Sequence, residues 1–177
     1  MFLFSTLLLA QRVPTQFAEL KPTFQRVAGD RWKDRASQSW AESGFNRLAV
    51  SPVGAKGLGQ AMDGTFSDYK KKRWVPLDAS PFDVLPAITG QHLYMNQIEG
   101  QMRTWMGPVP KDGGWYDASL AGYNAGPGNI KKCFFLTDQL GLPTMEWKRM
   151  LPKVTKQHSV ETLTYIPRNF KLRALLE

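Results

Sequence analysis

Glu42 is the residue of this chain whose position first suggests chemistry. It lies in the segment AESGFNRLAVSPVGAKGLGQAM, residues 41–62, where a helix-like run gives way to a turn. Gly44 ends the helix and Asn46 favours a turn, so the carboxyl group is presented at a corner. Glycines at positions 54, 57 and 59 allow the backbone to approach a ligand closely. We therefore expect an acidic side chain beside a cleft.

The element that positions Glu42 is predicted to be a helix that begins near Arg31, with Asp30 as its N-cap. Its core-facing residues recur every four positions, at Trp32, Ala36 and Trp40. This arrangement leaves Arg31, Lys33 and Arg35 in water. Glu42 then falls in the last turn, where the negative end of the helix dipole disfavours ionisation. The sequence therefore predicts a raised pKa for Glu42, as suits a general acid.

A second helical run, WYDASLAGY (residues 115–123), stops at the sequence NAGPG and presents Tyr123 and Asn124 at another corner. Near the C-terminus, Glu161 and Tyr165 lie one helical turn apart, ahead of Pro167. Together with Glu42, these side chains are the candidates for chemistry in the chain.

The remaining segments predict further helices and turns. Residues 78–107 form a helix that starts near Asp78 or Ser80, with Pro81 in its first turn. Residues 45–65 predict turns and short strands, residues 107–114 a loop, and residues 130–151 one or two helices broken around residues 141–143. The basic run at positions 70–73 is interpreted as a solvated face, in preference to an anion-binding rim. The long helix carries an apolar stripe typical of a core: Val84, Leu85, Ile88, Leu93, Tyr94, Ile98 and Met102.

Composition limits the classes of function. A chain of 177 residues that is 42% hydrophobic can bury one core, so a single domain is expected. The net charge of +8 favours polyanionic partners. No nucleic-acid-binding motif is present in the sequence, so we do not expect the protein to bind nucleic acid. Cys133 is the only cysteine, and His92 and His158 are far apart in the sequence. We therefore expect neither a metal site nor a cofactor.

The first ten residues, MFLFSTLLLA, are apolar. They are too few to span a bilayer, and they lack the positively charged start of a secretory signal. We expect an apolar segment of this kind to be buried, and we favour a neighbouring protein chain as the cover for residues 1–10.

Four segments, ESGFN, SPVGAKGLGQAM, LAGYNAGPG and ETLTYIPR, occur in an order that resembles the motif series of the soluble lytic transglycosylase family. The resemblance covers roughly residues 36–170. It implies a goose-lysozyme-like catalytic domain, mainly α with an α+β lysozyme-like character. On this interpretation residues 30–177 form one helical domain with a small strand and turn region after the catalytic helix. Residues 1–29 are then an apolar N-terminal segment and connector.

The resemblance also assigns roles to individual residues. Glu42 matches the single catalytic acid/base, and Tyr123, beside Asn124, matches a tyrosine near that carboxylate, which its phenol could orient. Position 59 departs from the family, because Gly59 stands where methionine is usual, and Asp63 replaces a common proline. A buried Glu161 would need a polar partner. The residues implied to contact sugars or close the cleft are Ser51, Gln60, Met62, Tyr123, Asn124, Glu161 and Tyr165.

The implied reaction needs one carboxyl group, whereas ordinary glycosidases use two. Glu42 would protonate the β-1,4 bond between N-acetylmuramic acid and N-acetylglucosamine in peptidoglycan, then take the proton of the muramyl C6 hydroxyl to give a 1,6-anhydromuramyl product. Two alternatives stay open: a lysozyme that hydrolyses the same bond, and a structural component of a virion or secretion apparatus with a vestigial site. The expected purpose is local penetration of the cell wall. The expected setting is a bacteriophage virion that delivers the enzyme to the bacterial envelope, with the bacterial periplasm as the alternative.

Overall fold

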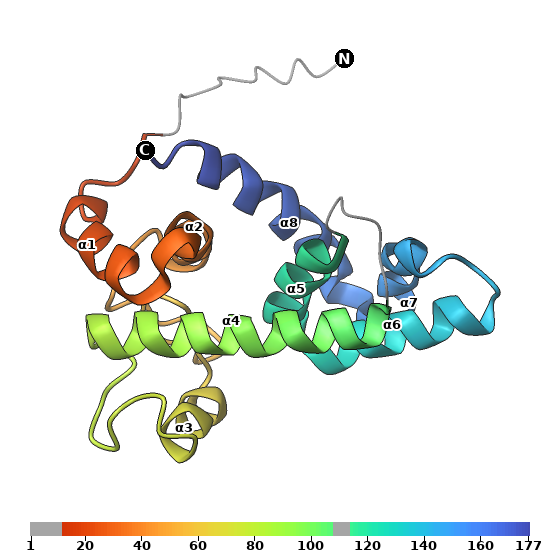
Figure 1. Ribbon diagram of the computed structural model, residues 1–177, viewed down its shortest axis with the longest axis horizontal. Coiled ribbons are helices and arrows are strands. Elements are labelled where there is room, and N and C mark those ends of the chain that lie inside the picture. Colours follow the sequence, from red (N-terminus) through yellow and green to blue (C-terminus); the bar gives the residue numbers. More distant parts are fainter. Residues whose placement is uncertain (1–11, 108–113) are drawn as a thin grey trace.

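A long central helix, α4 (Val84–Met106), is the element against which α1, α2, α3, α5 and α6 pack. The computed structural model describes residues 12–107 and 114–177. In Figure 1, α1 and α2 lie on one side of α4 and α3 lies on the other, while α8 runs across the molecule towards the start of α1. The chain ends of the described part therefore meet at one corner, where the Lys21 ammonium donates to the Glu177 carbonyl at 2.5 Å.

The other elements are short, and they follow one another with few intervening residues. They are α1 (Phe17–Ala28), the 3₁₀ helix η1 (Gly29–Arg31), α2 (Trp32–Ser43), α3 (Asp63–Lys71), α5 (Gly114–Ala125), α6 (Pro127–Gln139), η2 (Thr144–Met150), α7 (Leu151–Thr155), η3 (Lys156–His158) and α8 (Ser159–Ala174). The prediction of a mainly helical, lysozyme-like domain is confirmed. No helix of the described part is both long enough and apolar enough to cross a bilayer.

One large hydrophobic core joins α1, α2, α4, α5, α6 and α8. From α1 it takes Phe17, Leu20 and Phe24, and the rings of Phe17 and Phe45 stack at 5.1 Å. The expected division between residues 29 and 30 thus falls inside η1, which links α1 and α2, two helices that share this core. Residues 1–10, for which a covering chain is expected, lie outside the described residues.

One of the expected helix boundaries is corrected by the structure, and another is confirmed. The helix expected from residue 78 begins only at Val84, because Asp83 folds back to accept a hydrogen bond from the Ser80 N–H at 2.7 Å. Residues between 78 and 83 therefore form a turn. The break expected around residues 141–143 is confirmed, since α6 ends at Gln139 and η2 begins at Thr144. The loop expected at residues 107–114 lies almost entirely outside the described residues.

Turns, rather than strands, connect α2 to α3. Residues 45–62 contain two isolated antiparallel bridges, Val50 with Lys56 and Lys56 with Ala61. The described part of the chain contains no β-strand beyond these single bridges. Gln60 adopts the left-handed region with φ of 48°, in the turn that brings Ala61 back beside Lys56. The strand and turn region expected after the catalytic helix is therefore a compact set of turns.

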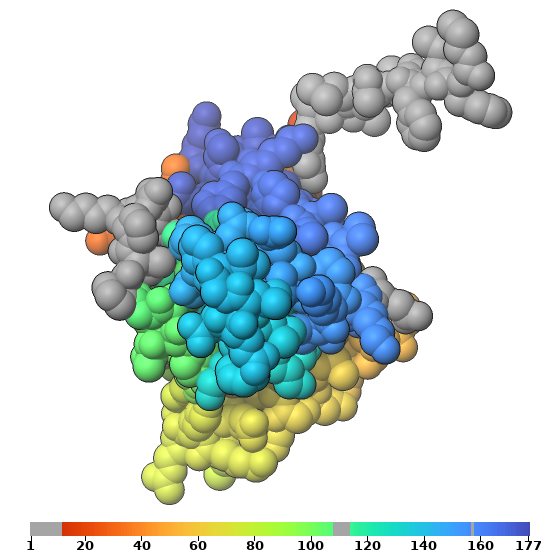
Figure 2. All heavy atoms as spheres, turned by 90° about the vertical axis from the view of Figure 1, so that its right-hand side faces the viewer, coloured from red at the N-terminus to blue at the C-terminus, as the bar shows by residue number. Residues whose placement is uncertain are grey.

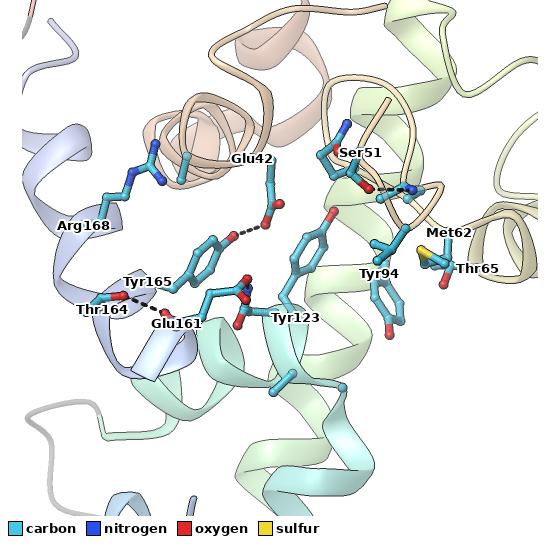
Figure 3. Close-up of a pocket in the computed structure, with 18 of the residues that line it drawn as sticks. Glu42, Ser51, Met62, Thr65, Tyr94, Tyr123, Glu161, Thr164, Tyr165 and Arg168 are labelled. Atoms are coloured by element: carbon cyan, nitrogen blue, oxygen red, sulfur yellow. Dashed lines mark hydrogen bonds between the residues drawn. The ribbon is translucent and has the colours of Figure 1, made fainter. Parts of the chain in front are cut away.

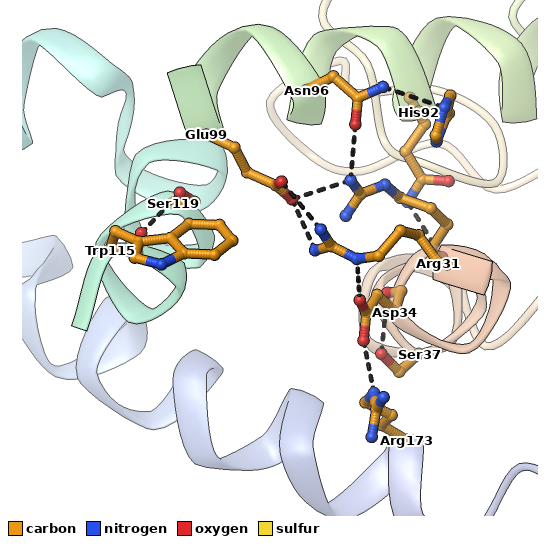
Figure 4. A network of polar contacts seen from close by, with 11 residues as sticks. Arg31, Asp34, Ser37, His92, Asn96, Glu99, Trp115, Ser119 and Arg173 are labelled. Carbon is orange, nitrogen blue, oxygen red and sulfur yellow. Dashed lines mark hydrogen bonds and ion pairs between the residues drawn. The ribbon is translucent and has the colours of Figure 1, made fainter. Parts of the chain in front are cut away.

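A buried network of charges fixes α2 against α4 and α8 (Figure 4). Arg35, expected in water, is fully buried, and its Nη2 donates to Glu99 Oε1 at 2.8 Å and to Asn96 Oδ1 at 3.0 Å. Arg31 also donates to both oxygens of Glu99, and Arg173 on α8 donates to Asp34 at 2.5 Å. Helical periodicity identified the apolar face of α2 but could not reveal that α4 places a carboxylate opposite Arg35.

Candidate active site

A cleft of about 760 Å³ opens where the end of α2, the turns of residues 51–62, the end of α5 and the first half of α8 come together. In both views of the whole molecule α3 (yellow) and α8 (blue) lie on opposite sides (Figures 1 and 2). Each contributes to the lining, α3 through Thr65 and Tyr69 and α8 through Thr164 and Arg168. All of the site residues expected from the sequence line this cleft: Glu42, Ser51, Gln60, Met62, Tyr123, Asn124, Glu161 and Tyr165.

Glu42 is half-buried at the end of α2, where Gly44 terminates the helix in the left-handed conformation. Its Oε1 accepts a hydrogen bond of 2.5 Å from the Tyr165 hydroxyl (Figure 3). Burial raises the pKa of Glu42 to about 7, against the lowering effect of the Tyr165 bond; Glu161 adds to the rise and Arg168 opposes it. Burial, rather than the helix dipole, is thus the main cause of the raised pKa. A carboxyl group that is half protonated near neutral pH can serve as both acid and base.

The phenol that holds Glu42 belongs to Tyr165 and not to Tyr123. The Tyr123 hydroxyl instead donates to the Gly59 carbonyl at 2.6 Å, which ties α5 to the turns after α2. Both rings lie beside Glu42 in Figure 3, but the dashed bond runs only to Tyr165. The expectation that Tyr123 orients the Glu42 carboxyl was therefore wrong in this structure, although Tyr123 still forms part of the cleft wall.

Glu161 lies at the rim of the cleft, with 66% of its side chain exposed. Val160 and Glu161 are the exposed residues of the first turn of α8, whereas Ser159 and Thr162 are buried, so Glu161 does not need a buried partner. Its Oε1 accepts from Asn124 Nδ2 at 3.1 Å, and Asn124 Oδ1 accepts from the Thr162 hydroxyl at 2.7 Å. These bonds hold the end of α5 against the start of α8.

The opposite wall presents polar groups that are held by the turns themselves. Ser51 Oγ accepts from the Ala55 N–H at 2.9 Å. The Gln60 Nε2 donates to the Gly57 carbonyl at 3.0 Å, which orients the amide and leaves its oxygen to accept from a ligand. Met62 is 46% exposed and forms an apolar part of the rim.

Sequence reasoning missed several residues of the lining. Two of them, Thr164 and Arg168, stand three residues after Glu161 and three after Tyr165, so they share one face of α8 with the expected residues. That spacing was a usable signal within the ETLTYIPR segment. Other lining residues gave no comparable signal in the sequence, among them Val53, Thr65, Tyr69 and Tyr94.

Replacement of Tyr165 by phenylalanine is expected to raise the pKa of Glu42 further. The Tyr165 hydroxyl stabilises the carboxylate and so lowers the pKa of Glu42. Without it, burial and the repulsion by Glu161 raise that pKa with less to counter them. Nuclear magnetic resonance titration of ¹³C-labelled glutamate side chains measures this pKa directly. Tyr94→Phe is the control, because Tyr94 lines the same cleft without a bond to Glu42. An unchanged pKa in Tyr165→Phe would contradict the assigned bond.

Gly59, which stands where the family usually has methionine, lies directly behind Tyr123. A Cβ at this position would come within 2.9 Å of the Tyr123 hydroxyl and 3.4 Å of Gln91. The space that a larger side chain would need is therefore filled by these two residues.

We expect Gly59→Ala to lower the free energy of unfolding by about 1–2 kcal/mol, since tight packing leaves no room for the methyl group. Urea unfolding measures the change. Gly64→Ala is the matched control, because a Cβ at Gly64 in α3 meets nothing within 4 Å and alanine favours helix. Equal effects of the two substitutions would refute the packing argument.

The helical fold and a half-buried carboxyl group with a raised pKa in a polar cleft define a lysozyme-like domain equipped with a general acid. Residues 39–140 match the family model described as the transglycosylase SLT domain, which covers more than half of the chain. The chain therefore belongs to the SLT transglycosylase family, as the sequence motifs suggested.

The names of similar proteins are consistent with this family. The chain is 30% identical to the membrane-bound lytic murein transglycosylase F of Alteromonas mediterranea, over 88% of this chain and 32% of the relative. Proteins of the same name from Shewanella sediminis and Pectobacterium atrosepticum are 26% and 30% identical, over 86% and 83% of this chain and 30% and 29% of their own lengths. The chain thus spans about a third of the length of the relatives it matches.

Proposed function

We propose that the chain is a peptidoglycan lytic transglycosylase that cleaves the β-1,4 bond between N-acetylmuramic acid and N-acetylglucosamine and leaves a 1,6-anhydromuramyl end. The observation that carries the proposal is the state of Glu42, a carboxyl group with a pKa of about 7 that is bonded to Tyr165 inside a polar cleft. The family, and the name lytic murein transglycosylase carried by its relatives, support the choice of substrate.

In the first step the neutral Glu42 carboxyl donates its proton to the glycosidic oxygen, and the bond from that oxygen to the muramyl C1 breaks. The N-acetylglucosamine part leaves with a free 4-hydroxyl group. The Tyr165 hydroxyl then donates to a full carboxylate, which strengthens the hydrogen bond between them. The positive charge left on the muramyl ring can be shared by the substrate's own N-acetyl group.

In the second step the Glu42 carboxylate takes the proton of the muramyl C6 hydroxyl, whose oxygen forms a bond to C1. Glu42 returns to its neutral form, and no water is consumed. One carboxyl group suffices because the acid of the first step is the base of the second. Glu161, the other carboxyl group of the cleft lining, stays at the rim, paired with Asn124.

We further propose that the polar wall of the cleft binds the glycan strand. The Ser51 hydroxyl and the amides of Gln60 and Asn124 offer the donors and acceptors that sugar hydroxyls and acetamides require. Met62 supplies an apolar surface for the face of a sugar ring, and Tyr123 closes the wall behind Glu42.

Mass spectrometry of the fragments released from purified sacculi tests the proposal. A lytic transglycosylase leaves anhydromuramyl ends, whereas a lysozyme leaves reducing ends that are heavier by one water. Binding to sacculi without release of any fragment would support a vestigial site instead.

The Glu161→Gln variant tests whether the cleft uses a second carboxylate, as a lysozyme would. If Glu161 were a second carboxylate that activates water, the variant would lose most of its turnover. We expect it to keep the wild-type product and a turnover within a few-fold of wild type.

For the setting, we propose action on the bacterial cell wall, with local penetration of that wall as its purpose. Delivery by a bacteriophage virion remains a separate proposal that depends on the apolar character of residues 1–10. The periplasm is the alternative, and the words "membrane-bound" in the names of the relatives favour it. Detection of the chain by mass spectrometry in purified phage particles, or its absence from them, decides between the two.

A further inference from the structure

Gln38 carries a buried amide that the reaction proposed above does not use. It lies on α2 one helical turn before Glu42, and none of its surface is exposed. Neither Nε2 nor Oε1 of its side chain has a hydrogen-bond partner in the structure. A buried polar group without a partner costs roughly 1–3 kcal/mol of folding free energy, so its presence behind a catalytic residue calls for an explanation.

The helix that packs against this part of α2 is α8. Gln38 and Glu42 are four residues apart on α2, Tyr165 and Asn169 are four apart on α8, and the two helices pack closely together. Burial raises the pKa of Tyr165 well above its usual value, and Glu42 adds to the rise, whereas the nearby amides of Gln38 and Asn169 lower it. Both amides therefore act on the hydroxyl that holds Glu42.

The hydrogen-bonding capacity of these groups determines what Gln38 can do. The Tyr165 hydroxyl gives its proton to Glu42, so its oxygen can only accept from a third group. Asn169 Nδ2 already donates to the Tyr165 carbonyl at 3.0 Å, which leaves the Gln38 Nε2 as the donor without a partner. Hydrogen bonds of catalytic groups are often long in the free enzyme and tighten in the complex with substrate.

We propose that Gln38 is a positioning residue whose Nε2 donates to the Tyr165 phenol oxygen and thereby orients and polarises the hydroxyl that holds Glu42. A phenol that accepts one hydrogen bond donates a stronger one, so Gln38 stabilises the Glu42 carboxylate without touching it. The effect is largest between the two proton transfers, when Glu42 is ionised. Its consequence for turnover rests on the proposed function, whereas its consequence for the Glu42 pKa does not.

The other ionisable groups around Glu42 are not altered by a change at Gln38. Glu161 and Arg168 face Glu42 from α8, and Tyr123 faces it from α5. Arg35, on the same helix as Gln38, is bonded to Glu99 on α4. A change in the pKa of Glu42 after substitution of Gln38 therefore reports on Tyr165.

The Gln38→Leu variant tests this role, since leucine fills similar space without an amide. Loss of one hydrogen bond of ordinary strength is expected to lower kcat about three- to tenfold and to move the alkaline limb of the kcat/KM profile upward by roughly half a pH unit. In a Tyr165→Phe background the same substitution should change kcat less than twofold and leave the limb in place. Gln91→Leu, which removes another buried amide that accepts from Ser39 Oγ, controls for a general loss of stability and should leave the limb unmoved.

Equal losses in the wild-type and Tyr165→Phe backgrounds, or an unmoved alkaline limb, would show that Gln38 only packs and would overturn the proposal. Gln38→Met, which keeps the unbranched shape, replaces the leucine variant if that variant does not fold. If wild-type protein released no fragments from sacculi, the proposed function would fail. In that case the pKa of ¹³C-labelled Glu42 still tests the positioning role of Gln38. A higher Glu42 pKa in Gln38→Leu than in wild type supports this role, and an unchanged pKa refutes it.

Discussion

Glu42→Gln is expected to reduce the cleavage of sacculi on the order of 10³-fold, because one side chain supplies both the acid and the base of the proposed reaction. Glutamine keeps the size of the side chain and still accepts the hydrogen bond from the Tyr165 hydroxyl, so the cleft should retain its shape. Binding of the variant to sacculi should therefore stay close to that of wild type. The release of soluble fragments and a sedimentation assay measure the two quantities, and a residual turnover above a tenth of wild type would remove Glu42 from its role.

The same substitution should stabilise the protein above neutral pH. The pKa of Glu42 is about 7 in the folded protein and 4.5 for an unperturbed side chain, so the folded state holds an extra proton between these pH values. The stability that the protonated Glu42 contributes to the folded state is fully present below pH 4.5 and is lost as the pH rises through 7. Relative to wild type, Glu42→Gln should gain up to about 3 kcal/mol of unfolding free energy between pH 5 and pH 8.

Urea unfolding at several pH values measures that gain. Glu161→Gln is the matched control, because Glu161 is mostly exposed and its replacement should show no comparable dependence on pH. A constant difference between wild type and Glu42→Gln from pH 5 to pH 8 would mean that the pKa of Glu42 is not raised. The stability lost at neutral pH is, on this account, the cost of keeping a general acid out of water.

Local sequence signals were enough to place the ends of two helices at the cleft. Gly44 after Glu42 and the run NAGPG after Tyr123 both indicate a helix end, and the structure ends α2 at Ser43 and α5 at Ala125. These signals depend on the backbone within a few residues, which is why they can be found in a single sequence.

Contacts between distant helices were beyond the reach of such signals. Tyr165 and Glu42 are 123 residues apart, and only the packing of α8 on α2 decides that this phenol, rather than that of Tyr123, meets the carboxyl group. Periodicity placed Glu161 on the same helical face as Tyr165 but could not tell that the Glu161 side chain is mostly exposed. The burial of Arg35 was missed for the same reason, since its partner Glu99 comes from α4.

That ion pair is the basis of the largest expected change in stability. Glu99, with 6% of its side chain exposed, accepts from both Arg35 and Arg31, and the Arg35 side chain is fully buried. Glu99→Gln keeps the shape of the side chain but leaves the Arg35 guanidinium buried without its counter-charge. We expect the free energy of unfolding to fall by about 3–5 kcal/mol.

Asp68→Asn is the matched control for that variant, because Asp68 pairs with Lys71 at the surface, where the two side chains are 59% and 72% exposed. Removal of an exposed pair should cost less than about 1 kcal/mol, so urea unfolding should separate the two variants clearly. Replacing the buried pair as a whole, as Arg35→Met with Glu99→Leu, should cost less than Glu99→Gln alone, because no unpaired charge then remains. If the double variant were instead the less stable of the two, the pair itself would stabilise the fold, and α2 would depend on the attraction between the charges to hold Glu42 at the cleft.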